Sequence, residues 1–126
     1  MGGSTYSRRK QRVQPSERNP EFTLAGKYFR GVVEDNKQWH QEELKHLYDI
    51  KRIPIDKLYA TKNKMSTATI NSETEKHSRM EDYEPINVIK QDKRYIVISG
   101  HERVVALMVR GFKRIKARVY DMNRKK

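Results

Sequence analysis

The fold is decided by residues 95–120, which read YIVISGHERVVALMVRGFKRIKARVY. A β-branched run at residues 96–98 favours a strand, and Ser99 and Glu102 have the spacing of a capping box at the start of a helix. The helix positions that would face a core have helical spacing: Val104, Val105, Leu107 and Met108. Gly111 suits the left-handed residue that ends a helix. The residues after it alternate apolar and polar, as in a half-buried strand: Ile115, Ala117 and Val119. The stretch predicts a strand, a tight turn, a helix and a second strand.

A strand that turns sharply into a helix creates a place for an anion, because the first backbone N–H groups of the helix are unpaired. Gly100 allows the backbone to approach a phosphate closely, and Arg103 adds a planar cation on the same turn. His101 is neutral near pH 7 and becomes a second cation if it is protonated. The alternative interpretation is that Ser99 and Glu102 only cap the helix and that Arg103 is a solvated surface charge. The convergence of Gly, His and Arg on one helix start favours a phosphate site.

These residues also resemble a known motif. Residues 100–106, GHERVVA, with Gly111 closing the helix, look like the phosphate-binding motif of the ParB/sulfiredoxin fold superfamily, which reads Gly-Glu-Arg-Arg in ParB proteins, Gly-Cys-His-Arg in sulfiredoxins and Gly-His-x-Arg in other members. Residues 53–58, IPIDKL, and 84–88, EPINV, are similar to two earlier strands of the superfamily, in the same order. The resemblance covers residues 53–121. It implies an α+β domain with a small mixed β-sheet and packed helices.

The resemblance further implies a phosphate or nucleotide site, whose residues would be Ser99, Gly100, His101, Glu102, Arg103 and Pro85. The implied cofactor is a nucleoside triphosphate, CTP or ATP, with Mg²⁺. The candidate catalytic residues are His101, Glu81 and Glu84, although a solvated acidic loop is the alternative for the two carboxylates. ParB proteins have Gly at the position of Glu81. Sulfiredoxin activity is excluded, because residue 101 is His and the chain has no cysteine to attack.

Two classes of function follow. The first is a ParB-like nucleotide-binding, DNA-associated protein, acting as a nucleotide-dependent switch with slow NTP hydrolysis. The second is an enzyme of the same superfamily, a nuclease or a phosphoryl-transfer enzyme. A plasmid or phage protein-interaction module that has kept only the fold is a further alternative.

Composition sets outer limits on these interpretations. The chain has 126 residues, which is enough for one small domain, and its lack of cysteine fits a reducing cytoplasm. No apolar run approaches the length of a membrane span. The four histidines have no ligand-like spacing, so we expect no metal site built by the protein alone.

The net charge of +12 is concentrated at the two ends of the chain. Residues 1–27 carry +4 and residues 110–126 carry +7, whereas residues 28–109 carry +1. Such basic ends predict contact with DNA or RNA through phosphates, with little sequence preference and a steep dependence on salt. The candidate nucleic-acid-binding residues are Arg8, Arg9, Lys10, Arg12, Lys113, Arg114, Arg124, Lys125 and Lys126. Improved solubility and an acidic protein partner are the alternatives.

The chain divides into a flexible basic arm at 1–27, a helical extension at 28–52, the domain at 53–121 and a basic tail at 122–126. In the extension, Asp35 is expected to cap a helix over 36–50. Its inward residues would be Trp39, Leu44, Leu47 and Tyr48. Packing is the default role of this helix, and a lid or a homodimer contact are the alternatives.

The first half of the domain is predicted from weaker signals. Residues 53–58 predict the first strand and residues 60–72 a loop. Ser72 and Glu75 have capping-box spacing and would open a helix near 73–81. A hairpin would then pair residues 86–88 with 96–98 around a turn at 91–93.

Overall fold

The computed structural model describes residues 21–76 and 83–122; residues 1–20, 77–82 and 123–126 lie outside this description. The elements, in chain order, are β1 (Phe22–Leu24), η1 (Ala25–Lys27), β2 (Gly31–Val32), α2 (Lys37–Leu44), β3 (Asp49–Pro54), η2 (Ile55–Lys57), β4 (Leu58–Ala60), β5 (Lys64–Ser66), α3 (Thr67–Lys76), β6 (Ile86–Gln91), β7 (Arg94–Ser99), α4 (His101–Val109) and β8 (Arg114–Asp121).

Most strands belong to one six-stranded mixed sheet in the order β2-β4-β7-β6-β8-β3. β2, β4 and β7 run parallel to one another, and β6 runs parallel to β8. The hairpin β6–β7 and the pair β8–β3 are antiparallel. β1 and β5 form a separate two-stranded antiparallel sheet. The predicted α+β class with a small mixed sheet is confirmed.

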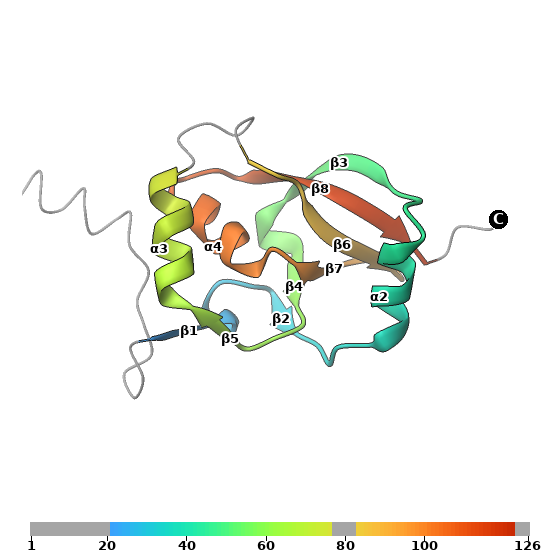
Figure 1. Cartoon of the computed structure of the whole chain (residues 1–126), viewed down its shortest axis with the longest axis horizontal. Helices are drawn as coiled ribbons and strands as arrows, with labels where there is room; N and C mark the ends of the chain where they lie inside the picture. Colours follow the sequence, from blue (N-terminus) through green and yellow to red (C-terminus); the bar gives the residue numbers. More distant parts are fainter. Residues whose placement is uncertain (1–20, 77–82, 123–126) are drawn as a thin grey trace, which may run out of the picture.

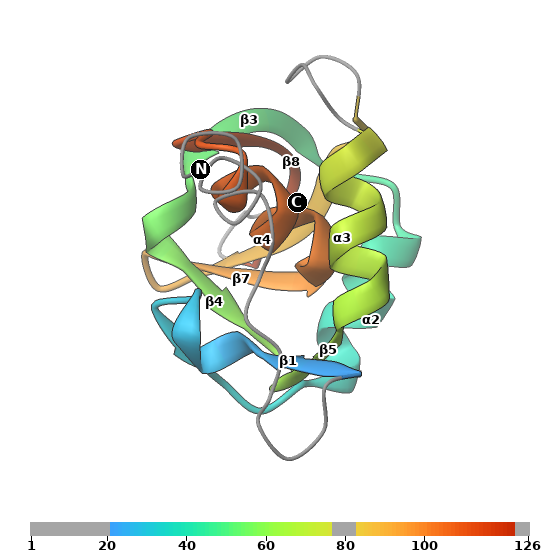
Figure 2. The same cartoon turned by 90° about the vertical axis from the view of Figure 1, so that its left-hand side faces the viewer.

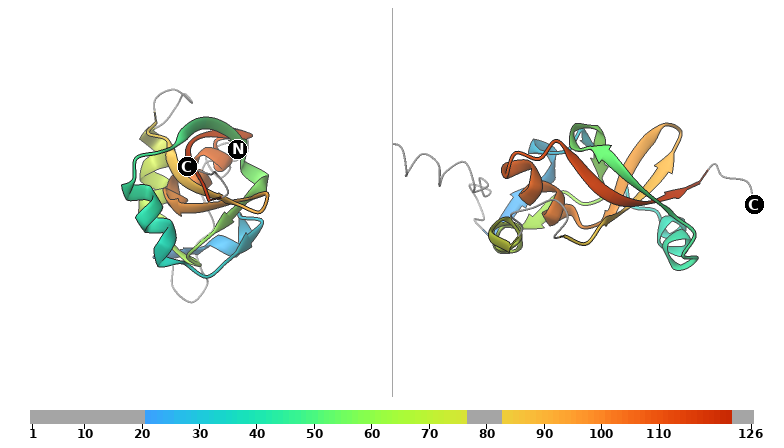
Figure 3. Two further views of the ribbon diagram at one scale, coloured as in Figure 1. Left: turned by 90° about the vertical axis from the view of Figure 1, so that its right-hand side faces the viewer. Right: turned by 90° about the horizontal axis from the view of Figure 1, so that it is seen from above.

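Two hydrophobic clusters hold the sheet from its two faces. The larger cluster includes Leu107 and Val104 of α4, Ile70 of α3 and Ile115 of β8. The smaller cluster joins Trp39 of α2 to side chains of the other face: Ile89, Ile96, Ile98 and Tyr120. Figures 1 and 3 show α3 beside α4 at one end of the long axis and α2 at the other end. The face bearing Trp39 and Tyr120 is called the outer face below.

The prediction for residues 95–120 is confirmed in its order of elements. β7, α4 and β8 follow one another, and Gly111 has the left-handed φ of 96° expected of a helix-terminating residue. Met108 is only partly buried, whereas Val104, Val105 and Leu107 are fully buried. The hairpin is also present, with its turn at Asp92 and Lys93, both of which have positive φ.

The capping box predicted for this helix is wrong. Gly100, with φ 96°, occupies the N-cap position, and no side chain caps the helix there. Ser99 is the exposed last residue of β7. Because Gly100 already makes the turn through a left-handed conformation, the carboxylate of Glu102 is left to bond elsewhere.

The predicted helix over 36–50 is too long. α2 ends at Leu44, His46 takes a left-handed φ of 58°, and β3 starts at Asp49 because its β-branched residues pair with β8. Asn36, and not Asp35, caps the helix by accepting from the Gln38 N–H. Trp39 is buried as predicted, but the other expected inward residues are exposed: Leu44, Leu47 and Tyr48.

The elements between residues 58 and 76 also differ from the prediction. The expected loop at 60–72 contains β5 and most of α3. α3 starts at Thr67, after Ser66, whose Oγ accepts from the Thr69 N–H at 3.2 Å as a capping residue does. Ser72 therefore lies inside the helix. The end of the predicted helix, 77–81, lies outside the described residues.

Residues 21–27 belong to the folded body, in contrast to the predicted flexible arm at 1–27. β1 pairs with β5, and Ala25 is fully buried. The arm's remaining residues, 1–20, lie outside the described part of the chain. Within the described ranges, no helix is long and apolar enough to cross a membrane.

Candidate functional site

The predicted phosphate turn begins at Gly100, between the end of β7 and the first turn of α4. A Cβ at this position would lie 2.6 Å from Cγ2 of Ile86, and the φ of 96° disfavours any other residue. Glycine is thus required here by packing and backbone conformation, whether or not a phosphate binds.

His101 is buried and acts as a hydrogen-bond acceptor. Its side chain is 3% exposed, and its Nε2 accepts from the backbone N–H of Thr61 at 3.0 Å. Its ring packs against Phe29 with centroids 5.6 Å apart. Burial, with the nearby charge of Lys62, lowers the pKa of His101 to about 4. His101 is therefore neutral at pH 7, as predicted, and its burial disfavours the second cation that protonation would create.

Glu102 joins the starts of two helices. Its Oε2 accepts from the backbone N–H of Ser66, just before α3, at 3.2 Å and from Lys62 Nζ at 2.9 Å. Burial raises the pKa of Glu102, but the hydrogen bonds from Lys62 and Ser66 outweigh this effect, and the pKa is lowered. The carboxylate thus sits as an anion where the first turns of α3 and α4 meet.

Arg103 is fixed by two partners inside the protein. Its Nε donates to Oε1 of Glu73, which is 8% exposed, at 2.9 Å. Its Nη1 donates to the backbone carbonyl of Glu84 at 2.7 Å. These bonds tie α4 to α3 and to the segment before β6, so Arg103 has a structural role in addition to any contact with a ligand.

Two other predicted site residues, Glu84 and Pro85, lie in the segment before β6. Glu84 has a side chain that is 72% exposed and pairs with Arg118 Nη2 at 2.9 Å, and the carbonyl of Pro85 accepts from Arg118 Nη1 at 3.3 Å. Arg103 brings the backbone of Glu84 to the turn, whereas the Glu84 carboxylate is directed to β8. Glu81 lies outside the described residues. No group of three metal-ligating side chains occurs in residues 21–76 and 83–122.

A second set of cations lies on the outer face of β8. Because Ile115, Ala117 and Val119 face the larger cluster, the alternate residues face outward: Arg114, Lys116 and Arg118. Arg52 of β3 lies directly opposite Lys116 in the register and so shares its face. We call these four residues, Arg52, Arg114, Lys116 and Arg118, the β8 row.

Two tyrosines lie among the cations of the β8 row. Lys116 Nζ is 5.8 Å from the ring centroid of Tyr83, and the Arg118 guanidinium is 5.8 Å from that of Tyr48. Tyr83 also accepts a hydrogen bond from the Lys116 N–H through its hydroxyl, at 2.6 Å. The rings therefore hold the long basic side chains along the strand.

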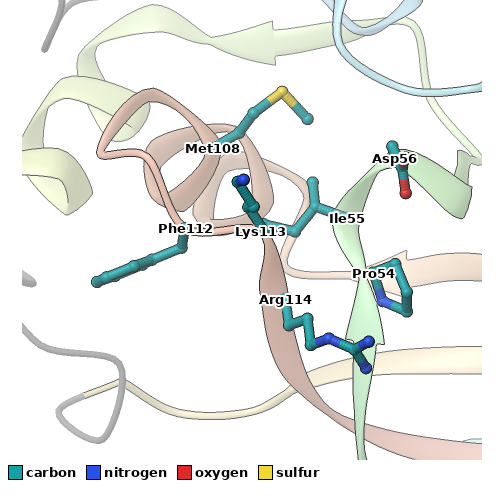
Figure 4. Close-up of a pocket in the computed structure, with 7 residues that line it drawn as sticks. All are labelled: Pro54, Ile55, Asp56, Met108, Phe112, Lys113 and Arg114. Atoms are coloured by element: carbon teal, nitrogen blue, oxygen red, sulfur yellow. The ribbon is translucent and has the colours of Figure 1, made fainter.

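Lys113 and Arg114, two of the predicted nucleic-acid-binding residues, line a cavity of about 510 Å³ at the start of β8. Figure 4 shows their side chains pointing in opposite directions, with Arg114 beside Pro54 and Lys113 near Ile55. The remaining candidate nucleic-acid-binding residues lie outside the described parts of the chain: Arg8, Arg9, Lys10, Arg12, Arg124, Lys125 and Lys126.

Several residues important to these sites were missed from the sequence. Lys62, Glu73 and Thr61 contact the predicted turn from 30 to 40 positions away in the chain, and no local pattern indicates such contacts. The β8 row had a readable signal, because the alternation of residues 114–120 already places three cations on one face.

Comparisons with known proteins support the fold. No protein-family model matches the chain, and no curated protein matches it. The chain is similar to the crystal structure of sulfiredoxin from Arabidopsis thaliana, with a TM-score of 0.51 and 21% sequence identity, over 58% of this chain and 85% of that one. This likeness, at low identity, shows the fold alone: the protein has an α+β fold of the ParB/sulfiredoxin type.

Proposed function

We propose that the protein binds nucleic acid through its phosphates, and that the β8 row is the binding surface of the folded body. The observation that carries this proposal is the line of cations along one strand, with Arg52 beside it on β3. Consecutive same-face residues on a strand lie about 7 Å apart, close to the spacing of phosphates along a nucleic-acid strand. The row also includes Arg114, which the charge distribution had indicated.

The surrounding side chains suit a phosphate surface better than a base-reading one. Glu84 pairs with Arg118, and the four members of the row are all cationic. Contacts of Lys and Arg with phosphates release condensed counterions and carry little sequence information. Binding should therefore be similar for unrelated DNA or RNA sequences and should weaken steeply with salt.

The test is the salt dependence of binding to a fluorescent duplex, measured by anisotropy. The double variant Arg114→Gln/Lys116→Gln should reduce the slope of log K against log salt by about 1.8, since each lost contact removes about 0.9. The matched control is Lys37→Gln/Lys76→Gln, which removes the same charge from α2 and α3. If both doubles change the slope equally, the chain has only a diffuse positive charge and the β8 row is not the binding surface.

Nucleotide binding at the start of α4 is a second candidate function, favoured by the Glu102 carboxylate. This anion lies where the first turns of α3 and α4 meet, with Lys62 beside it. A nucleotide phosphate could take the place of the carboxylate and keep the same donors. His101 would contribute packing to such a site, because its ring is enclosed and its Nε2 already accepts a hydrogen bond.

Thermal shift against ATP, CTP, GTP and ADP, with and without Mg²⁺, tests this candidate. A nucleotide at 100 times its dissociation constant adds about 2.7 kcal/mol of stability. Glu102→Gln should strengthen binding, because the competing negative charge is removed. No shift for the wild type and for Glu102→Gln at millimolar nucleotide would reject the candidate without affecting the β8 row.

A further inference from the structure

A further group of cations, separate from the β8 row, lies at the edge of the sheet where three parallel strands start. β2, β4 and β7 are neighbours and run in the same direction, so their first residues meet at one edge. Figure 2 shows β4 and β7 starting on the same side of the molecule. Arg30 precedes β2, Lys57 precedes β4, Lys93 precedes β7 and Arg94 begins it. The Arg30 N–H donates to the Leu58 carbonyl at 2.9 Å, and this hydrogen bond links the start of β2 to the start of β4.

These residues line a hollow of about 280 Å³, whose walls are Arg30, Lys57, Tyr59, Lys93 and Arg94. Four of the five lining residues are cationic, and none is acidic. The Arg94 guanidinium lies 5.7 Å from the ring centroid of Tyr59. The ring also lies close to Gly31, where a Cβ would lie 3.1 Å from Tyr59 Cε2. The ring is thus held in place, and Arg94 is positioned over it.

Four positive charges around one small hollow raise the local positive potential and favour an anion between them. The acidic residues nearest in the chain, Asp56 and Asp92, do not line the hollow. The β8 row differs in this respect, because Glu84 pairs with one of its members. The lining residues of the hollow thus carry an excess of positive charge, as expected of a site that binds an anionic ligand.

We propose that this hollow, the strand-start hollow, binds a multiply charged phosphate group, such as a di- or triphosphate or the terminal phosphate of a nucleic-acid strand. Four cations match a group of two to four negative charges better than a phosphodiester, which carries one. The volume is just below the roughly 300–1,000 Å³ of pockets that enclose larger ligands, so it suits a phosphate group and not a whole base and sugar. Arg94 supplies a planar donor for bidentate bonding, and Lys57 and Lys93 supply point charges.

The experiment measures binding of sodium tripolyphosphate to the full chain by calorimetry at low chloride. The test variant is Lys57→Gln/Lys93→Asn. It removes two exposed charges without touching the Tyr59–Arg94 contact, and Asn tolerates the left-handed φ of 69° at residue 93. We expect its dissociation constant to rise at least about tenfold, since charge-assisted hydrogen bonds are lost. Melting curves check that the variant is folded.

Two controls separate this proposal from the one for the β8 row. Arg114→Gln/Lys116→Gln and Lys37→Gln/Lys76→Gln each remove two charges and should leave tripolyphosphate binding within about twofold. No binding by the wild type at millimolar tripolyphosphate, or an equal loss in all three doubles, would overturn the proposal.

A further arm identifies the source of the phosphate. Oligonucleotides with a 5′-triphosphate and with a 5′-hydroxyl are compared by anisotropy at equal salt. A preference for the triphosphate end that disappears in Lys57→Gln/Lys93→Asn assigns the hollow to strand ends. Equal binding of the two oligonucleotides, with tripolyphosphate still bound, assigns it to a free polyphosphate or the phosphates of a small molecule.

Discussion

The first turn of α4 and the β8 row both contain residues that the sequence singles out, but the side chains of the two regions make different contacts. In the turn, His101, Glu102 and Arg103 all have partners within the protein. In the β8 row, Arg118 pairs with Glu84, whereas Arg114 is exposed and Lys116 is partly exposed, with its Nζ 5.8 Å from the ring centroid of Tyr83. A motif that matches a known binding site can thus be held by structural contacts, while a plain alternation of residues builds the more accessible charged surface.

The largest expected effect tests the structural role of the turn. Gly100→Ala should lower the free energy of unfolding by about 2–5 kcal/mol, from the left-handed φ together with the overlap with Ile86. Gly111→Ala is the matched control, because it has the same φ of 96° but no atom within 4 Å of the added Cβ. It should cost only about 1–2 kcal/mol. Urea unfolding of both variants gives the difference, and equal losses would show that the Ile86 contact is not limiting.

The sequence predicted the order of elements around this turn well and the contacts of the turn poorly, for one physical reason. The order β7, turn, α4 and β8 follows from local signals, namely a β-branched run, glycine and helical spacing. The partners of the turn come from the segment between β4 and β5, from β5 and from α3. The local signals of these elements are weak, because α3 is rich in Thr and Ser, and β4 and β5 have three residues each. Contacts with residues distant in the chain determine which groups Arg103 and Glu102 bind. No local pattern in the sequence indicates these contacts.

The same limit explains the error at β3. The helical pattern of residues 36–50 extends past Leu44, but pairing of Ile50 and Ile53 with β8 converts the end of that segment into a strand. Tertiary pairing overrides the local preference. This pairing also places Arg52 in the β8 row.

The second prediction uses the buried histidine. Because the pKa of His101 is about 4 in the folded protein and 6.5 when exposed, the unfolded chain binds more protons between these values. The contribution of neutral His101 to stability is complete above pH 6.5, falls by about 3 kcal/mol as the pH drops from 6.5 to 4, and levels off below pH 4. His101→Asn should flatten this part of the pH profile in urea titrations. Glu102, whose pKa is also lowered, adds a loss that begins only below pH 4.5.

The third prediction concerns Arg103. If it served only a ligand, its removal would not affect the unliganded protein. Because it satisfies Glu73, which is 8% exposed, Arg103→Gln should cost about 1–3 kcal/mol without any ligand. Lys76 Nζ lies 3.7 Å from Glu73 and should limit the loss, so Arg103→Gln/Lys76→Gln should cost more than the sum of the single changes. An unchanged denaturation midpoint for Arg103→Gln would mean that the ion pair adds nothing to stability.

The smallest effect on stability is expected where the effect on binding is largest. Arg114 is exposed, and Gln at position 116 keeps two of the four methylene groups of Lys116. Arg114→Gln/Lys116→Gln should therefore change the free energy of unfolding by no more than about 0.5 kcal/mol, the usual range for surface positions. Removing like charges from one strand also relieves repulsion, so the change can have either sign. A loss of several kcal/mol, measured by urea unfolding, would show that these cations hold β8 to its neighbours. The β8 row would then resemble the turn of α4, and the contrast between the two regions would fail.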